Sequence, residues 1–142
     1  MSESRPEKLK DFSAVNVLVV EDEFIVQLTL KVQLEALGCN VVGSARDAAT
    51  ALKKARELKP DVVLMDIGLY GSNGIDATRD ILAYAPAQVV VVTAYGDDRV
   101  QQALQAGARL ALTKPVVEEQ LAQAIATVAV DVEAVRERVK GN

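Results

Sequence analysis

The sequence contains no histidine and a single cysteine, Cys39. Without histidine, the chain has no Ser-His-Asp or Cys-His catalytic set, no histidine metal ligand and no phosphohistidine of its own. One cysteine excludes an internal disulfide and a multi-cysteine zinc site. Aromatic residues make up only 4% of the chain, so a surface that stacks on nucleic-acid bases is not expected.

Long apolar runs and an excess of positive charge are also missing. Half of the 142 residues are apolar, but no run approaches the roughly 18 residues that span a bilayer. Residues 1–8 are polar and lack the apolar core of a signal peptide. A net charge of −4, with no cluster of lysine or arginine, argues against a nucleic-acid surface. We therefore expect a cytoplasmic protein with one domain and no membrane or nucleic-acid partner.

Short β-branched runs alternate with longer segments of helical character along the chain. The expected strands are residues 15–20, about 41–42, 62–65, 89–93 and 110–113. The expected helices are residues 24–37, 47–58, 75–84, a segment capped by residues 96–98 that runs to 106, and a last helix from about 117. Asp47 is the expected N-cap of the second helix, which closes before Pro60.

Five strands that alternate with five helices predict an α/β fold. The strands form a doubly wound parallel sheet, with helices covering both faces. We expect residues 1–13 to be a flexible tail, residues 14–130 to form the domain, and residues 131–142 to extend the last helix.

Polar side chains follow four of the five expected strands at the same end. Glu21 and Asp22 follow the first strand, Asp66 the third, Thr93 the fourth and Lys114 the fifth. Ligands of open parallel sheets bind outside the carboxyl ends of the strands, so we expect these groups to meet. Taken singly, each has an ordinary explanation: Asp22 could cap a helix, Thr93 could be a plain strand residue and Lys114 a surface lysine.

Together these groups indicate phosphoryl chemistry. Several carboxylates at one edge need a cation, and oxygen ligands without histidine or cysteine favour Mg²⁺. A bound Mg²⁺ would also bind a phosphoryl oxygen. Asp66 would then be the nucleophile that forms an aspartyl phosphate. Lys114 and Thr93 would contact two further phosphoryl oxygens.

These segments resemble the receiver domain of two-component response regulators, over about residues 14–130. The matching segments are residues 17–23, residues 64–67, Gly74, residues 92–94, residues 106–108 and residues 113–115. The resemblance implies a flavodoxin-like fold with strand order 2-1-3-4-5. It implies that Asp66 receives a phosphoryl group from the phosphohistidine of a sensor histidine kinase or a histidine phosphotransfer protein.

The resemblance also assigns roles to the neighbouring residues. Glu21 and Asp22 match the acid pair of the magnesium site, in which Asp22 and Asp66 would bind the ion directly and Gly68 would offer a backbone carbonyl. Thr93 matches the switch hydroxyl and Lys114 the phosphate-pairing lysine, followed by a cis bond to Pro115. Such a protein is not an enzyme beyond catalysing its own phosphorylation and dephosphorylation.

Three positions depart from the usual receiver pattern. Ala111 stands three residues before Lys114, where receivers usually carry a tyrosine or phenylalanine switch. Tyr95 instead stands two residues after Thr93, as in a receiver subgroup with an aromatic just after the switch threonine. Our hypothesis is that Tyr95 replaces the switch or screens the phosphoryl group from water; the alternative is an ordinary loop residue. Tyr70 occupies a position where many receivers have proline, which predicts a less rigid loop.

Two helices carry more apolar residues than packing on the sheet requires. The first is apolar on two sides, which indicates either a wide buried face or a partner surface; the two sets are Ile25, Leu28, Val32 and Ala36, and Val26, Leu30, Leu34 and Leu37. The last helix has apolar residues at spacings of four and three: Leu121, Ile125, Val128, Val132, Val135 and Val139. This seam could pack on the sheet near its start and on a second copy near its end.

The leading interpretation is a stand-alone receiver that signals through contacts with a downstream protein or passes its phosphate onward. One alternative is a phosphate sink that drains a kinase. Another is a Mg²⁺-dependent phosphohydrolase, but such enzymes need a second acid close to the nucleophile, and the residue two after Asp66 is Gly68. The chain could also be cut from a longer protein.

Overall fold

The computed structural model describes residues 12–94 and 96–141, apart from the side chains of residues 136 and 139–141. Its strands are β1 (Asn16–Val20), β2 (Asn40–Ala45), β3 (Val62–Asp66), β4 (Gln88–Thr93) and β5 (Leu110–Thr113). Its helices are α1 (Phe24–Ala36), α2 (Ala48–Leu58), α3 (Gly74–Tyr84), α4 (Val100–Gln105) and α5 (Glu118–Gly141). The alternation expected from the sequence is confirmed.

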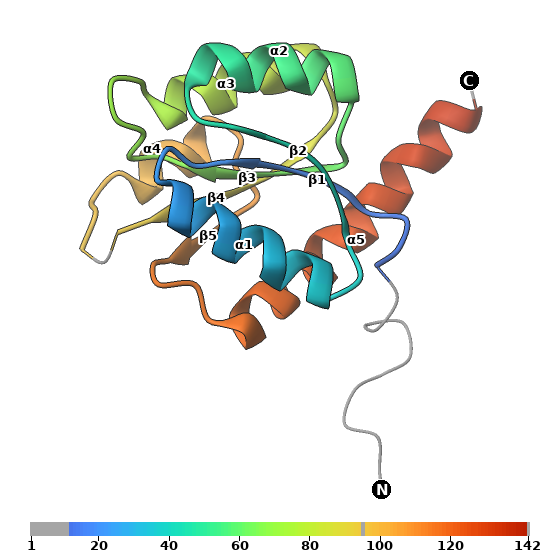
Figure 1. The fold of residues 1–142 in the computed structure, drawn as a ribbon. Coiled ribbons are helices and arrows are strands. Elements are labelled where there is room, and N and C mark those ends of the chain that lie inside the picture. The colour runs from blue at the N-terminus through green and yellow to red at the C-terminus, as the bar shows by residue number, and fades with distance from the viewer. Residues whose placement is uncertain (1–11, 95, 142) are drawn as a thin grey trace, which may run out of the picture.

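The strands form a parallel sheet in the order β2-β1-β3-β4-β5, which confirms the flavodoxin-like arrangement. Helices α1 and α5 cover one face, and α2, α3 and α4 cover the other (Figure 1). Side chains of a strand alternate between the two faces. Val17 and Val19 of β1 therefore pack toward α1 and α5, whereas Leu18 and Val20 pack toward the opposite helices. Burial on both faces explains why β3 and β4 are almost entirely apolar.

The predicted start of the fourth helix is wrong. Helix α4 begins at Val100, and its N-cap is Arg99, which makes no side-chain capping bond. The Asp97 carboxylate does not cap the helix, because it accepts hydrogen bonds from the backbone and the guanidinium of Arg99 instead. By contrast, Asp47 caps α2 as predicted, accepting from the Thr50 backbone N–H at 2.8 Å.

Phe12 belongs to the packed domain, although it falls within the stretch expected to be a tail. Its side chain is 2% exposed and lies in the core beside Val15, and its carbonyl accepts from the Val15 N–H at 2.9 Å. Residues 1–11 lie outside the described chain, so their role as a tail stays a prediction.

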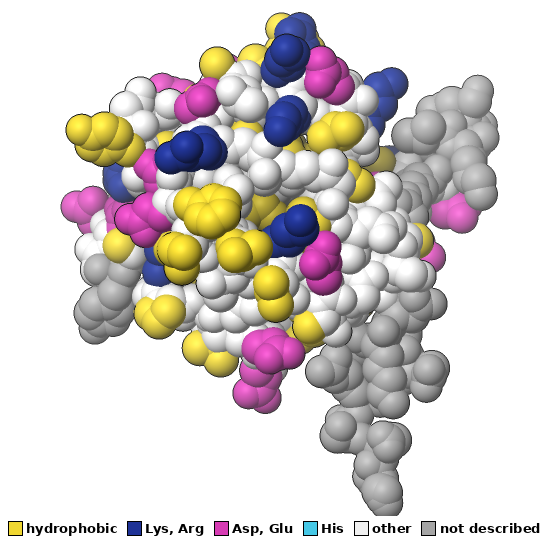
Figure 2. All heavy atoms as spheres, in the orientation of Figure 1, with side chains coloured by type: hydrophobic (Ala, Val, Ile, Leu, Met, Phe, Trp, Pro, Cys, Tyr) yellow, Lys and Arg dark blue, Asp and Glu magenta, His cyan; other side chains and the backbone are white. Residues whose placement is uncertain are grey.

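Helix α1 buries only one of its two apolar sides. Leu30 and Leu34 are in the core, whereas Ile25 is 69% and Val32 56% exposed. Figure 2, which looks onto α1, shows hydrophobic side chains gathered on this surface. The interpretation of α1 as having one wide buried face is therefore wrong. We call the exposed set, Phe24, Ile25, Leu28 and Val32, the α1 apolar surface.

The seam of α5 is divided in the same way. Its first four members, Leu121, Ile125, Val128 and Val132, are buried in the core, so the start of the seam packs on the sheet as expected. Val135 is half-buried, and the side chain of Val139 is outside the description. Among the described helices, none is long and apolar enough to cross a membrane.

Gly74 opens α3 directly against the end of β3. A Cβ atom there would lie 2.5 Å from the Ile67 Cα and would overlap the Asp66 carbonyl. Both neighbours are backbone atoms, which cannot move without displacing Asp66. A glycine at this position thus lets α3 pack against the strand that carries Asp66.

Gly74→Ala should therefore lower the free energy of unfolding by about 2 kcal/mol, within the usual cost of overpacking. Gly43→Ala is the matched control, because the closest atom to its Cβ would be the end of the Leu58 side chain at 2.7 Å, which can move aside. Urea unfolding measures both. Equal stability of the two variants would contradict this account of Gly74.

Candidate functional site

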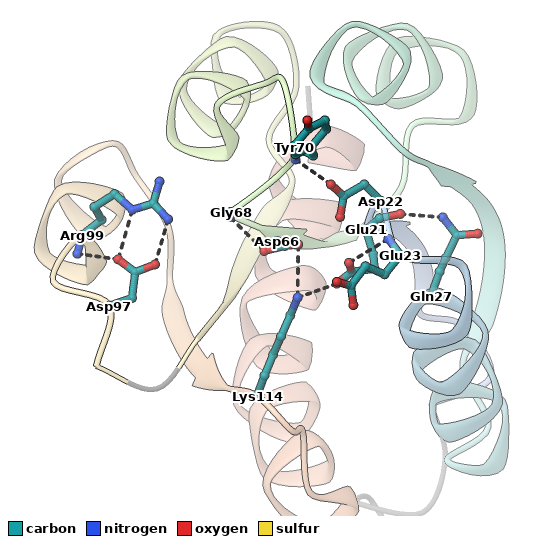
Figure 3. A network of polar contacts seen from close by, with 10 residues as sticks. All are labelled: Glu21, Asp22, Glu23, Gln27, Asp66, Gly68, Tyr70, Asp97, Arg99 and Lys114. Carbon is teal, nitrogen blue, oxygen red and sulfur yellow. Dashed lines mark hydrogen bonds and ion pairs between the residues drawn. The ribbon is translucent and has the colours of Figure 1, made fainter.

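Three charged side chains meet at the carboxyl ends of the strands (Figure 3). Glu21 directly follows β1 and is fully buried, and Asp66 ends β3 and is 4% exposed. Lys114, after β5, places its Nζ 2.9 Å from Glu21 Oε1 and 3.2 Å from Asp66 Oδ2. The structure thus brings together the predicted groups of three separate strands, Lys114 lying between the two carboxylates.

Backbone N–H groups fix the orientation of the carboxylates. Gly68 donates to Asp66 Oδ1 at 2.8 Å, Glu23 donates to Glu21 Oε2 at 3.0 Å, and Tyr70 donates to Asp22 Oδ2 at 2.5 Å. The alternative in which Asp22 or Glu23 caps α1 is not observed, because the N-cap residue Glu23 makes no side-chain capping bond. The Asp22 carboxylate is held by the Tyr70 N–H instead of capping the helix.

The hydrogen bond from the Tyr70 backbone N–H to Asp22 gives a reason why this chain has tyrosine where many receivers have proline. Proline has no backbone N–H and could not hold Asp22 in this way. The Tyr70 ring itself is 90% exposed, so its backbone makes the recorded contact with the site. The sequence indicated only that a rigid proline is missing here. It could not indicate the hydrogen bond to Asp22, because the pattern of side chains does not show what a backbone N–H will bind.

The carboxylates of Glu21, Asp22 and Asp66 form a group that fits a hard cation. One oxygen from each lies within 4.8 Å of the others, with no nitrogen or sulfur donor in the set. Three carboxylates face a single ammonium, so the cluster is short of positive charge. Burial raises the pKa of the Glu21 carboxyl, and the contact with Lys114 opposes that rise. The donor chemistry and the charge deficit both suit Mg²⁺.

Lys114 remains an ammonium in this setting. Partial burial acts to lower its pKa, but the contact with Glu21 and the charge of Asp66 outweigh burial and raise it. The peptide bond from Lys114 to Pro115 is cis, as the family resemblance implied.

Thr93 ends β4 beside the site and is 3% exposed. Its hydroxyl is buried and makes no hydrogen bond of good geometry within the described residues, yet it lies close enough to Asp97 to affect that carboxyl. The bonds from Arg99, helped by the Thr93 hydroxyl, hold the pKa of Asp97 well below its usual range.

Arg99 is a residue near the site that sequence reasoning missed. It pairs with Asp97 through two guanidinium bonds of 3.0 and 2.8 Å. A Cβ atom at Gly68 would lie 3.5 Å from Asp66 Oδ1 and 3.6 Å from Arg99 Nη2. The Arg99 guanidinium and the Asp66 carboxylate are therefore both neighbours of Gly68. Nothing in the sequence around Arg99 indicates that this arginine lies near the site.

The positions that depart from the receiver pattern are only partly described. Ala111 lies on β5 opposite Val91, is half-buried and packs against the core on the side of α2, α3 and α4. Tyr95 falls outside the described residues, so both hypotheses for its role stay predictions.

A buried acid, an ammonium beside it and two further acids that suit a cation are the kinds of groups that phosphoryl-transfer sites use. Residues 17–126 match the family model of the response regulator receiver domain. The chain is 36% identical over 111 residues to the chemotaxis protein CheY of Thermotoga maritima, an alignment that covers 77% of this chain and 92% of CheY.

Two further similarities extend the comparison. The response regulator GacA of Pseudomonas aeruginosa is 44% identical over 114 residues, which cover 78% of this chain and 53% of GacA, so the chain spans about half the length of that relative. The solved CheX-CheY-BeF3-Mg complex of Borrelia burgdorferi matches with a TM-score of 0.75 and 26% identity, over 80% of this chain and 88% of that one. The fold, the site and the family match together show that the chain belongs to the response regulator receiver family.

Proposed function

We propose that Asp66 accepts a phosphoryl group from the phosphohistidine of a sensor histidine kinase or histidine phosphotransfer protein, in a Mg²⁺-dependent reaction. The phosphorylated protein then signals through altered contacts with a downstream protein. One observation carries this proposal: the Lys114 ammonium lies between the buried carboxylates of Glu21 and Asp66, with Asp22 alongside. Membership of the receiver family supports it.

In the proposed reaction, an Asp66 carboxylate oxygen attacks the phosphorus atom of the donor. The P–O bond to Asp66 forms as the P–N bond breaks, and its electron pair returns to the imidazole nitrogen. Lys114 and the Thr93 hydroxyl contact two phosphoryl oxygens. Asp22, Asp66 and the Gly68 carbonyl, with Glu21 nearby, would hold Mg²⁺, which would supply positive charge to the transferring group. In dephosphorylation, water attacks the phosphorus and the P–O bond to Asp66 breaks.

The Borrelia CheX-CheY complex contains Mg and BeF3, a mimic of a phosphoryl group, which supports the same chemistry here. A phosphate sink without an output partner would use the same site. The lifetime of the phosphoryl group distinguishes the two functions, because a signal requires lasting phosphorylation and a sink loses the group quickly. A phosphohydrolase of small phosphoesters is less well supported, because Gly68 leaves that position without an acid.

The α1 apolar surface supports a protein donor over a small molecule. It begins at Phe24, three residues after Glu21, so it starts at the edge of the site. Phe24 is 65% and Ile25 69% exposed, an unusual placement for large apolar side chains beside a charged site. We propose that a helix of the donor packs on this surface and presents its phosphohistidine to Asp66.

Intact mass after incubation with acetyl phosphate and Mg²⁺ tests the acceptor chemistry. We expect the mass of one phosphoryl group to be added to the protein, and no gain for Asp66→Asn or without Mg²⁺. If the folded wild-type protein gains no phosphate, or if Asp66→Asn gains it equally, the proposed function is wrong.

Ile25→Glu should affect phosphorylation by a protein donor but not phosphorylation by a small molecule. Phosphorylation by acetyl phosphate should stay unchanged, because Ile25 is 69% exposed and is not one of the residues that hold the carboxylates. Transfer from purified histidine kinases that have autophosphorylated on ATP should slow about tenfold, a loss typical of removing one anchor from an interface. Unchanged transfer from a kinase that phosphorylates the wild-type protein would contradict a donor surface on α1.

The end of α5 supports a second, separate proposal, a homodimer. Val132 and Val135 form one wall of a groove of about 690 Å³, and the opposite wall comes from the ends of α2 and α3, including Arg56, Lys59 and Tyr84. The apolar seam of α5 thus continues past the sheet with no further strand to cover it. Glu133 and Glu137 are exposed on the same helix and complement Arg56 and Lys59 in charge. We propose that α5 of a second copy packs in this groove.

Val135→Glu should shift the protein toward monomer in sedimentation or light-scattering measurements. Val132 is unsuitable for this test, because it is 5% exposed and part of the core. Val130→Glu is the matched control, since Val130 is 69% exposed on the same helix and does not line the groove. A wild-type protein that is monomeric at high concentration would rule out the dimer.

A further inference from the structure

Asp97 and Arg99 form an ion pair beside the phosphoryl site that the proposed reaction leaves unused. The pair is well formed: Arg99 Nε lies 3.0 Å from Asp97 Oδ1, Nη2 lies 2.8 Å from Oδ2, and the Arg99 backbone N–H donates to Oδ1 at 2.9 Å. Asp97 is mostly buried, with 10% of its side chain exposed, whereas Arg99 is 40% exposed. The carboxylate is fixed, and the longer arginine side chain has room to move.

The guanidinium lies near two carboxylates, those of Asp97 and Asp66. It is bonded to Asp97, and its Nη2 is also the atom that, with Asp66 Oδ1, borders the space beside Gly68. That space remains open because Gly68 has no side chain. Figure 3 shows Arg99 and Asp97 on the α4 side of Asp66, opposite to Asp22. A group added to Asp66 on this side would approach the guanidinium.

Charge favours such an approach once Asp66 is phosphorylated. The carboxylates of Glu21, Asp22 and Asp66 carry three negative charges, of which Lys114 balances one, and a divalent cation would balance the remaining two. A phosphoryl group replaces the single charge of Asp66 with about two. The site then lacks one positive charge, which is the charge that Arg99 carries. Arginine binds phosphate oxygens through two parallel hydrogen bonds, as it now binds Asp97.

We propose that Arg99 is a phosphoryl-binding residue and that Asp97 holds it back in the unphosphorylated protein. On phosphorylation, Arg99 exchanges the Asp97 carboxylate for the phosphoryl oxygens on Asp66. Asp97 then loses its main partner, and the loop between β4 and α4 changes its contacts. This inference rests on the proposed function, because it needs a phosphoryl group on Asp66.

The exchange makes an unusual prediction for an ion pair: its two members have opposite effects on phosphoryl binding. Arg99→Gln removes a ligand and should weaken the binding of beryllium trifluoride, in the presence of Mg²⁺, about tenfold. Asp97→Asn releases Arg99 and should strengthen that binding several-fold. Fluorine NMR measures the bound fraction of beryllium trifluoride directly. Arg99→Lys, which keeps the charge without the bidentate geometry, should fall between wild type and Arg99→Gln.

A purely structural ion pair would behave differently. Arg99→Gln and Asp97→Asn would each break the pair and have the same effect on the loop. Both variants would then weaken the binding of beryllium trifluoride, or neither would change it. Either result overturns the inference. Asp76→Asn and Arg79→Gln serve as the matched control, because this exposed pair on α3 has the same charges with an N–O distance of 3.1 Å. Neither control variant should change the affinity.

Two further comparisons separate this inference from the proposed function. Wild-type protein that is folded but binds no beryllium trifluoride would overturn both. Wild-type binding that is lost in Asp66→Asn, together with equal effects of Asp97→Asn and Arg99→Gln, would overturn only the role of Arg99. Urea unfolding of each variant confirms that the fold is intact before affinities are compared.

Discussion

The contact of the Lys114 ammonium with Glu21 and Asp66 is the interaction on which the site depends. It joins the end of β5 to the ends of β1 and β3, which lie far apart in the sequence. Two buried carboxylates so close together would repel each other without a positive charge between them. Lys114 supplies one charge and leaves a deficit. That deficit is the physical reason that a cation would bind at this edge of the sheet, and the bound cation would then offset the charge of a phosphoryl group.

The parallel sheet places these groups together at little cost in structure. Strands β1, β3 and β5 each contribute their last residue or the residue that follows. Short loops then hold the carboxylates through the backbone N–H groups of Gly68, Glu23 and Tyr70. Gly74 allows α3 to begin against β3, so the strand end cannot shift. The strands therefore set the positions of the carboxylates, whereas the ion pair of Asp97 and Arg99 lies on one side of the site, with Arg99 40% exposed.

Much of this could be predicted from the sequence, because apolar periodicity fixes the strands and parallel pairing brings their ends together. The meeting of Glu21, Asp66 and Lys114 and the capping by Asp47 are examples, whereas the strand order was implied only by the resemblance to receiver domains. What could not be predicted depends on three-dimensional neighbours. Asp97 binds Arg99 instead of capping α4, the Tyr70 backbone binds Asp22, and only packing decides which apolar side of α1 is buried.

Titration with Mg²⁺, followed by amide NMR, tests the central claim that this cluster is a cation-dependent phosphoryl site. The Gly68 and Tyr70 amides donate directly to Asp66 and Asp22, so they report on these carboxylates. The account predicts saturable shifts of both signals with Mg²⁺, and their loss in Asp66→Asn. If saturating Mg²⁺ leaves both amide signals unchanged, or if the Mg²⁺-induced shifts persist in Asp66→Asn, the account is contradicted.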